Sequence, residues 1–590
     1  MGVDRLGEAA RAAGLSATAA RHLARAVEEP PPADRRCRVR LRYGQALALG
    51  QVAAALPGCD AYREAPDDAL RTEAAVAPAK THGYAHQLGE SVRLLDAAID
   101  RCADPGLRRQ ALAEQLLWAT WWVDDPLRAD RTRLLDRIAP SPAGDGVVER
   151  LLITLHAWSL VLRGRPRAEV LASSRRVLRP GVVFADAFTG MEIATITTFT
   201  QEYAGEAAVA DSLLDRAIGE FEREGRHGTH LAFAHANRGR AALRCGRLSD
   251  AVADADIPLR PAARSGNGTP AEWFATGIPV EAYLARGEPT RAEAVVSQHD
   301  PRHRQDHRVR PVPGIVPGSP ASARDRSDEA ITALREVGRR LDAAPITNPA
   351  VCPWRFEPAR ALRHSTPAEA REIAATAHDQ AEVFGDPATR GRALRAVAAL
   401  GAGVGALEES ARLLRDAPDR LHYLHTLADL GRALARSGHT SDARRTPAEA
   451  LAPADDCGAL ALRADTARRL TALGTTPDRP RRVNALSPRL RRVAEPAAEG
   501  RSEAEIAHGM PLSLENVRDL VREAHAATGT TSRAELRRAF PAADRAPGDH
   551  APGDREPGRF PSTATGADGH SLRTAGRAST VSFATLPRLD

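Results

Sequence analysis

Apolar residues recur at spacings of three and four from Leu6 to about Val296, and again from about Ser327 to Leu473. This spacing places apolar side chains on one face of a helix. Alanine fills many of the positions between, and short glycine or proline breaks separate one stretch from the next. The pattern therefore predicts helix after helix over most of the chain.

A glycine is followed five residues later by an alanine at several breaks, namely Gly50/Ala55, Gly205/Ala210, Gly246/Ala251, Gly287/Ala292 and Gly438/Ala443. Three of these pairs are separated by steps of 41 residues, and Gly164 continues the series backwards, with Ala168 one residue early. We expect each glycine to end a helix in the left-handed conformation, and each alanine to let the next helix approach closely. A helix pair repeated at about forty residues is typical of a TPR-like superhelix, so we predict an all-α fold.

Four helix starts follow one another between Leu486 and Phe540. Ser487 precedes a proline that suits a first helical position, and Ser513 can cap a third helix. Two capping boxes begin at Ser502 and Ser532, each with a glutamate three residues later. Only four residues, Gly509-Met510-Pro511-Leu512, separate the second helix from the third. This is the short turn of a helix-turn-helix, whose second helix enters a DNA groove.

Apolar positions agree with these four helices. The predicted inward stripes are Val493 and Ala497, then Ile506 and Met510, then Val517, Leu520, Val521 and Ala524, and finally Leu536 and Phe540. Their spacing of three and four is that of one helix face.

The order and spacing of these motifs resemble the DNA-binding domain of LuxR-type transcription regulators. The residues that carry the resemblance are Leu486-Ser487-Pro488-Arg489, Ala498-Glu499-Gly500-Arg501-Ser502, Glu505-Ile506-Ala507, Leu512-Ser513, Val517 and Ser532-Arg533-Ala534-Glu535-Leu536. The run from Leu451 to Ala459 is similar to the last repeat of the large ATP-binding members of that family. The whole chain thus resembles the C-terminal part of those regulators, in which helical repeats precede a terminal helix-turn-helix.

The resemblance implies that the third helix is a recognition helix and that DNA is contacted by Ser513, Glu515, Asn516, Val517, Arg518 and Arg522. Asparagine can pair with adenine and arginine with guanine in the major groove, whereas Arg522 suits a phosphate. The alternative for these residues is a solvated helix face, because Glu515, Asp519 and Glu523 make this helix slightly acidic. Two further departures from the family are Leu490, where a glutamate is usual, and Pro496, where a leucine is usual.

Residues for enzyme chemistry are scarce. A P-loop needs a glycine-rich loop before its lysine, and Lys80, the only lysine, has no glycine just upstream. Gly401-Ala402-Gly403-Val404-Gly405 matches a loose dinucleotide pattern but follows a helical stretch, which favours a helix-helix turn. Trp118, Trp121 and Trp122 cluster on one predicted helix, which favours a packing site over a ligand cage. We expect no enzyme activity, no cofactor and no ATPase module within this chain.

Composition sets wider limits. The chain has 590 residues, which is too long for one core, and a net charge of +6, a mild bias that does not by itself indicate nucleic acid. Six scattered cysteines have no metal-site or redox spacing. With neither a signal sequence nor a run of eighteen apolar residues, we expect a cytoplasmic protein without a membrane partner.

One segment breaks the helical pattern. It contains His299, Asp300, His303, Asp306 and His307, followed by four prolines. Such residues could bind a metal, but a solvated loop is the favoured interpretation. The predicted organisation is repeats over 1–298, a Pro-rich loop over 299–326, further repeats over 327–474, a linker over 475–484, the helix-turn-helix domain over 485–541 and a disordered tail over 542–590.

Two functions of different class follow. The first is a transcription regulator that binds double-stranded DNA through the helix-turn-helix and receives a protein or small-molecule effector on the repeats. RNA polymerase and a second copy of the chain are further candidate partners. The alternative is a helical-repeat interaction scaffold whose helix-turn-helix has degenerated.

Overall fold

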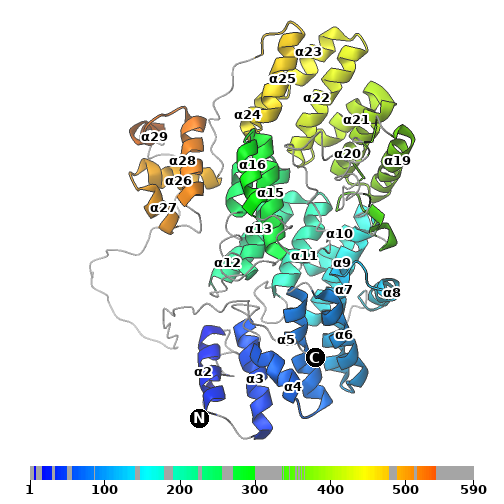
Figure 1. Ribbon diagram of the computed structural model, residues 1–590, viewed down its shortest axis with the longest axis vertical. Helices are drawn as coiled ribbons and strands as arrows, with labels where there is room; N and C mark the ends of the chain where they lie inside the picture. The colour runs from blue at the N-terminus through cyan, green and yellow to red at the C-terminus, as the bar shows by residue number, and fades with distance from the viewer. Residues whose placement is uncertain are drawn as a thin grey trace, which may run out of the picture.

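The structure, a computed structural model, consists of two helical arrays and a small group of four helices (Figure 1). The residues that it describes are 5–7, 16–29, 33–48, 56–84, 87–139, 146–178, 190–223, 229–255, 270–298, 335, 338–339, 341–344, 346–351, 355–356, 359, 362–363, 366–477, 488–509 and 514–539. Every described element is helical.

The first array runs up to residue 298. It consists of α2 (Ser16–Glu28), α3 (Ala33–Ala48), α4 (Leu56–Glu64), α5 (Asp68–Tyr84), α6 (Leu88–Arg101), α7 (Pro105–Trp121), α8 (Arg128–Ile138), α9 (Val147–Leu162), α10 (Arg167–Val177), α11 (Gly190–Tyr203), α12 (Ala207–Arg223), α13 (Thr229–Arg244), a helix over residues 248–255, α15 (Pro270–Arg286) and α16 (Pro289–Gln298).

The second array and the four-helix group, called here the module, follow. The second array consists of α19 (Pro367–Phe384), α20 (Pro387–Val397), a π-helical turn (Ala398–Ala402), α21 (Gly403–Arg415), α22 (Arg420–Arg436), α23 (Thr440–Ala448), α24 (Leu451–Cys457) and α25 (Leu460–Ala472). The module consists of α26 (Pro488–Ala498), α27 (Glu503–Gly509), α28 (Leu514–Thr528) and α29 (Arg533–Ala539).

Helices of the first array stack as a repeat solenoid. Each packs on its neighbour in sequence, and the alternate helices α5, α7, α9, α11, α13 and α15 also contact one another in succession. A helix therefore touches both its partner within a pair and its counterpart in the next pair, which is the contact pattern of repeat proteins. The prediction of an all-α, TPR-like repeat superhelix is confirmed.

A column of aromatic rings runs through this stack. The ring of Trp158, on α9, lies 5.8 Å from that of Trp121 on α7, 5.8 Å from Phe199 on α11 and 5.9 Å from Tyr203. Trp158 is completely buried. Trp121 of the predicted cluster thus packs between successive pairs, Trp118 is buried in the same core, and Trp122 follows the end of α7 and packs against that core.

The glycines of the 41-residue series end helices as predicted. Gly164, Gly205, Gly246 and Gly287 have φ values of 62°, 82°, 76° and 78°. After each, the next residue's N–H donates to a carbonyl five residues back, as Glu206 does to Gln201 at 2.9 Å. This is the Schellman ending, which a residue with a side chain adopts only with strain.

The alanine half of the pattern holds for three of these four units. Ala210, Ala251 and Ala292 are buried, whereas Ala168 is exposed. The reason is one extra residue: α10 begins three residues after Gly164, while α12 begins two residues after Gly205. Val170 consequently takes the buried position in the first unit. Gly50 and Ala55 lie outside the described residues.

The glycine turns of the first array face the second array. A Cβ atom on Gly205 would lie 2.6 Å from Asp386 Oδ1, and one on Gly246 would lie 2.6 Å from Cys457 Sγ. Near Gly164, the N–H groups of Thr347 and Asn348 donate to the carbonyl of Leu162 at 3.0 and 3.2 Å. The ends of the first array's helices therefore receive caps and close contacts from the chain that follows.

The dinucleotide-like glycine run is a turn between helices. The π-helical turn over Ala398–Ala402 leads directly into α21, and Gly401 and Gly403 have φ values of 117° and 78°. No strand precedes it among the described residues, so the interpretation as a helix-helix turn is confirmed.

We predict that Gly246→Ala lowers the free energy of unfolding more than Gly438→Ala. Both glycines have positive φ, 76° and 81°, so both variants carry the left-handed cost of about 1–2 kcal/mol. Only at Gly246 would the methyl group overlap the second array, since nothing lies within 4 Å of a Cβ on Gly438. This overlap should lower the free energy of unfolding by a further amount of about 1–3 kcal/mol, which urea denaturation can measure. Equal losses of unfolding free energy in the two variants would contradict the close contact between the arrays.

Candidate functional site: the module and its contact with the first array

The four helices of the module share one apolar core. Its buried members are Leu490, Val493, Ala494, Ala497, Ala498, Ile506, Val517, Leu520, Val521, Ala524 and Leu536. These include every residue of the predicted inward stripes except Met510 and Phe540, which lie outside the described residues. Leu490, where the family usually has a glutamate, is only 4% exposed and packs in this core.

Proline at position 496 does not break its helix. α26 continues to Ala498, and Pro496 lies in its last turn. The carbonyl of Pro496 accepts a hydrogen bond from Arg501 N–H at 3.0 Å, in a Schellman ending that uses Gly500 with φ 98°. The proline therefore lies where a helix is about to end, not deep within it.

The capping boxes form, one of them in a modified way. Ser502 Oγ accepts from Glu505 N–H at 3.2 Å, and Ser502 N–H donates back to Glu505 Oε2 at 2.7 Å. Ser532 Oγ likewise accepts from Glu535 N–H at 3.3 Å. The returning carboxylate of Glu535, however, accepts from Thr531 N–H at 2.6 Å instead of from Ser532.

The predicted DNA-contacting residues divide into two groups. The side chains of Glu515, Arg518 and Arg522 are 79%, 59% and 71% exposed. Asn516 and Val517 are buried, at 6% and 0%. In this arrangement Val517 is a core residue, and Asn516 does not present its amide on the helix surface. Ser513 lies outside the described residues.

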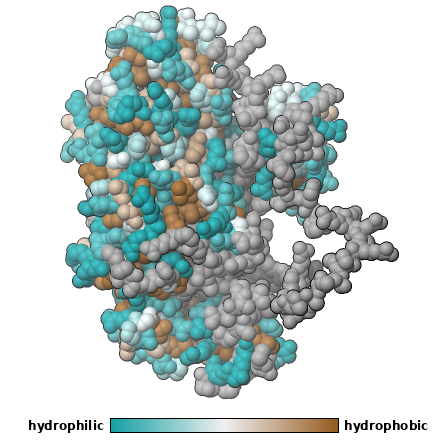
Figure 2. All heavy atoms as spheres, turned by 180° about the vertical axis from the view of Figure 1, so that it is seen from behind, coloured by the Kyte–Doolittle hydropathy of each residue, from teal (hydrophilic) through white to brown (hydrophobic). Residues whose placement is uncertain are grey.

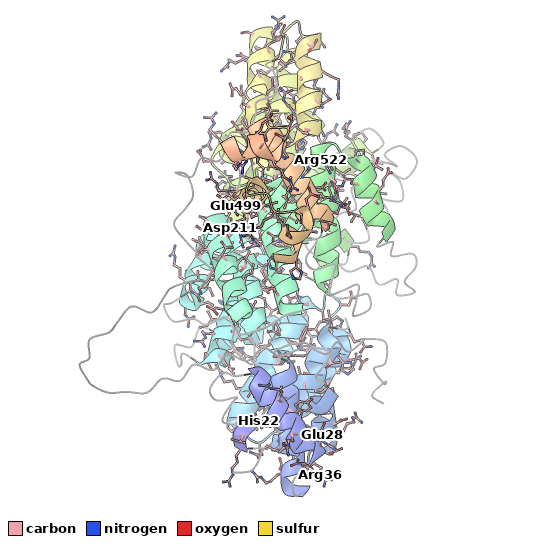
Figure 3. The ribbon with its side chains drawn as sticks, turned by 90° about the vertical axis from the view of Figure 1, so that its left-hand side faces the viewer. His22, Glu28, Arg36, Asp211, Glu499 and Arg522 are labelled. Atoms are coloured by element: carbon pink, nitrogen blue, oxygen red, sulfur yellow. The ribbon has the colours of Figure 1, made fainter. Side chains whose placement is uncertain are left out.

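The module lies beside the first array (Figures 1 and 3), and the acidic side of α28 contacts α15 and α16. Arg291 of α16 forms an ion pair with Asp519, and its Nη2 lies 3.5 Å from Glu515 Oε1. Arg286 of α15 lies 3.2 Å from Glu523 Oε2. Ser249 Oγ donates to Glu523, and Ala253 joins the apolar core of the module.

The two arginines are held in place by the array itself. Glu288 accepts from Arg286 Nε at 2.7 Å through one oxygen and from Arg291 Nη1 at 3.1 Å through the other. The guanidinium of Arg291 also lies 4.5 Å from the centre of the Tyr283 ring. Burial raises the pKa of Tyr283 to about 12, so the ring is neutral near neutral pH. The contact surface is therefore ordered by the array's own residues.

A small open groove of about 480 Å³ lies where α28 meets α16. It is lined by Glu288, Arg291, Glu515, Arg518, Asp519 and Arg522. The sequence contained one signal for this contact: Glu515, Asp519 and Glu523 follow at four-residue spacing, which places them along one side of a helix. Their partners Ser249, Arg286 and Arg291 had no such signal, because they lie more than two hundred residues away.

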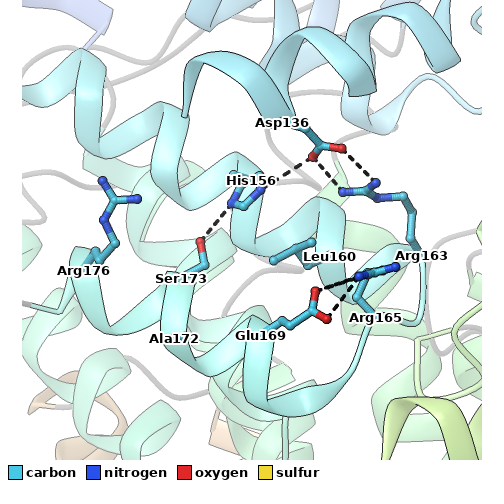
Figure 4. Close-up of a pocket in the computed structure, with 9 residues that line it drawn as sticks. All are labelled: Asp136, His156, Leu160, Arg163, Arg165, Glu169, Ala172, Ser173 and Arg176. Atoms are coloured by element: carbon cyan, nitrogen blue, oxygen red, sulfur yellow. Dashed lines mark hydrogen bonds and ion pairs between the residues drawn. The ribbon is translucent and has the colours of Figure 1, made fainter. Parts of the chain in front are cut away.

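A second cavity, of about 600 Å³, lies between α8, α9 and α10 (Figure 4). His156 Nδ1 lies 3.0 Å from Ser173 Oγ, and its Nε2 lies 3.5 Å from Asp136 Oδ1. Burial lowers the pKa of His156, with Asp136 opposing, so the imidazole is neutral near neutral pH. This row of side chains has the residue types of a hydrolase triad.

The surroundings of that row do not suit acyl transfer. Ser173 lies inside α10, where helical hydrogen bonding occupies the backbone N–H groups that could form an oxyanion hole. Asp136 is held by both terminal nitrogens of Arg163, at 3.0 and 2.8 Å. Arg165 is likewise paired with Glu169 at 3.1 Å. The row is best described as a network of ion pairs and hydrogen bonds between helices.

Lys80 belongs to a buried charge cluster. Its Nζ lies 2.7 Å from Glu192 Oε1 and 3.8 Å from Glu114 Oε1. Glu114 is completely buried and accepts from Trp118 Nε1 at 3.0 Å. Burial raises the pKa of Glu114 to about 7, with Lys80 opposing and Glu192 assisting the shift. The lysine thus links α5, α7 and α11 and does not lie in a phosphate-binding loop.

The described residues provide neither a metal site nor a membrane-spanning helix. No group of three or more histidine, cysteine, aspartate or glutamate side chains there could hold a metal ion. Within the same residues, every helix is too short or too polar to cross a membrane. The histidine-rich segment from His299 to His307 lies outside the part of the chain that the structure describes.

Comparisons with known proteins add structural neighbours only. No family model and no curated protein matches the chain. The TPR domain of P58(IPK) is 13% identical, with 73% of this chain and 97% of that chain covered and a TM-score of 0.24. The APC/C hetero-tetramer Cut9-Hcn1 is 12% identical, with 91% and 90% covered and a TM-score of 0.32. These scores are low, so the repeat fold rests on the packing of the helices described above.

We predict that Glu114→Gln flattens the pH dependence of stability. The pKa of Glu114 is about 7 when folded against an ordinary value of 4.5, so the folded state holds the proton more tightly than the unfolded one. The free energy of unfolding should therefore fall as the pH rises between those values, and glutamine removes this dependence. Thermal melts from pH 5 to pH 8 would measure it, with the exposed Glu90→Gln as control. An unchanged slope in Glu114→Gln would contradict the assignment.

Proposed function

We propose that the chain is a helical-repeat interaction protein whose first array binds a helix of acidic character. The observation that supports this proposal is that the array already holds such a helix from outside its own stack, namely α28. Stacked helix pairs offer extended surfaces of this kind, and neighbouring pairs keep those surfaces rigid. The interaction function thus follows from what the array does within its own chain.

The chemistry of the surface defines the kind of partner. Arg286 and Arg291 are only 15% and 26% exposed and are oriented by Glu288, so they present their guanidinium groups in fixed positions. Carboxylates at four-residue spacing on a helix match two such groups. On the face seen in Figure 2, apolar residues at the surface are scattered among hydrophilic ones. At Arg286 and Arg291, charge complementarity with carboxylates is the favoured mode of recognition.

We predict that a peptide with the sequence of Leu514–Thr528 binds the array when the chain's own α28 cannot. The full chain carrying Asp519→Arg and Glu523→Arg should bind the labelled peptide, measured by fluorescence polarisation. Adding Arg286→Glu and Arg291→Glu should weaken that binding by about tenfold or more, because like charges then face each other between array and peptide and the exchanged charges let the chain's own α28 dock again. Equal affinity in both variants would contradict recognition by these arginines.

Sequence-specific DNA binding by the module is the second candidate function. What favours it is the order of the four helices around one core, with both capping serines in use and Arg518 and Arg522 exposed on α28. In such modules the exposed side of the second helix of the helix-turn-helix meets the base edges. A small-molecule effector, RNA polymerase, a second copy of the chain and a cytoplasmic location stay predictions.

We predict different effects for the two exposed arginines if the module binds DNA. Arg518→Ala should reduce discrimination among selected DNA sequences, by about 1–3 kcal/mol at the affected base pair. Arg522→Ala should weaken binding to all DNA sequences by a similar factor and make the affinity depend less on salt concentration. Arg412→Ala is a matched control, since Arg412 is 64% exposed and paired at the same three-residue spacing as Arg522. DNA selection and mobility-shift titrations at matched salt would measure both effects. If both variants bind DNA as tightly and as selectively as the unsubstituted chain, α28 does not read DNA.

A further inference from the structure

We propose that the first array masks the module through an ionic latch, made of Arg286 and Arg291 on the array and Asp519 and Glu523 on α28. In the closed state, α28 is unavailable to DNA or to any other partner that uses its exposed side. The latch itself is inferred from contacts within the chain. Its consequence for DNA rests on the second candidate function above.

The latch consists of two ion pairs between side chains on packed helices. Asp519 is 11% exposed and pairs with Arg291, while Glu523 is 28% exposed and pairs with Arg286 at 3.2 Å. Ser249 reinforces the second pair, because its hydroxyl donates to Glu523 and accepts from Arg286 Nη1 at 3.2 Å. A partly buried pair of this type is stronger than an exposed one, and salt screens it less.

Both sides of the latch are ordered before they meet. Glu288 and Tyr283 fix the two guanidinium groups within the array. The carboxylates lie on a helix whose opposite side, Val517 and Ala524, is completely buried in the module core. Little side-chain freedom is lost on closing, so the pairs contribute more than two flexible surface charges would.

The closed latch places the array along one flank of the side of α28 that would face DNA, while Arg518 and Arg522 stay 59% and 71% exposed. A helix turns by about 100° per residue, so Asp519 and Arg522 lie roughly opposite Val517 and Ala524, and Arg518 lies to one side of them. Asp519 contacts Arg291, and all three residues line the groove shared with α16. A major groove about 12 Å wide encloses a helix on both flanks. The array occupies one flank, so docking on the array and insertion into the groove exclude each other.

The latch also explains the unusual charge of α28. Carboxylates on a recognition helix oppose binding to phosphates. Here Glu515, Asp519 and Glu523 all have arginine partners on the array. Their presence is therefore accounted for by docking, and a partner that competes for Arg286 and Arg291 would open the latch.

Zero-length coupling tests whether the latch closes in solution. The chain has a single natural lysine, Lys80, so Arg286→Lys places a nearly unique amine beside Glu523. Carbodiimide adds to the carboxyl group to give an O-acylisourea, and the amine displaces the urea to form an amide, so the linked chain is lighter by the mass of one water. Mass spectrometry of the full chain should find the link to Glu523. Arg412→Lys should couple to Glu409 but not to α28.

Charge exchange tests whether opening has the proposed consequence. Arg286→Glu with Arg291→Glu should open the latch, increase the radius of gyration by small-angle scattering and strengthen binding of selected DNA by about five- to a hundredfold, a typical allosteric coupling. Adding Asp519→Arg and Glu523→Arg should restore the compact form. Absence of the Glu523 link together with an unchanged radius would overturn the latch. An open form that still binds no DNA would retain the latch and reject DNA binding alone.

Discussion

The left-handed glycine turn that ends each of α9, α11, α13 and α15 is the constraint on which this structure depends. At Gly164, Gly205, Gly246 and Gly287 the turn reverses the chain, satisfies the last carbonyls of a helix and leaves room for another segment to approach. A side chain at Gly205 or Gly246 would collide with the second array. The same feature thus sets the period of the first array from α9 onward and the contact between the two arrays.

Buried charges are the second recurring feature, and they connect helices that are distant in sequence. Lys80 joins Glu114 and Glu192 from three helices, and burial raises the pKa of the enclosed Glu114. At the other end of the first array, Arg286 and Arg291 join carboxylates on α28. Ion pairs of this kind contribute specificity of arrangement more than stability, because desolvation offsets much of the attraction. They fix which helix lies beside which.

The contact between the module and the first array changes how the charged residues of α28 are interpreted. Considered alone, the helix has two exposed arginines for DNA and a row of carboxylates that opposes it. In the folded chain the carboxylates have partners, and the arginines border the same groove. An interaction surface and a masked recognition helix are therefore two descriptions of one interface. This is why the repeat-scaffold function and the DNA-binding function can be separated only by opening that interface.

The sequence by itself determined the local features of this protein, because helix formation, capping and glycine turns depend on residues a few positions apart. It predicted the 41-residue unit, the core stripe of α28 through Val517 and Leu520, and the capping roles of Ser502 and Ser532. It misplaced the buried role of Ala168, where a single extra residue moved Val170 inward. The tertiary structure alone decided that Asn516 is buried and that Arg286 and Arg291 meet Glu523 and Asp519. Those contacts join segments more than two hundred residues apart, and no periodic pattern encodes which distant surfaces come together.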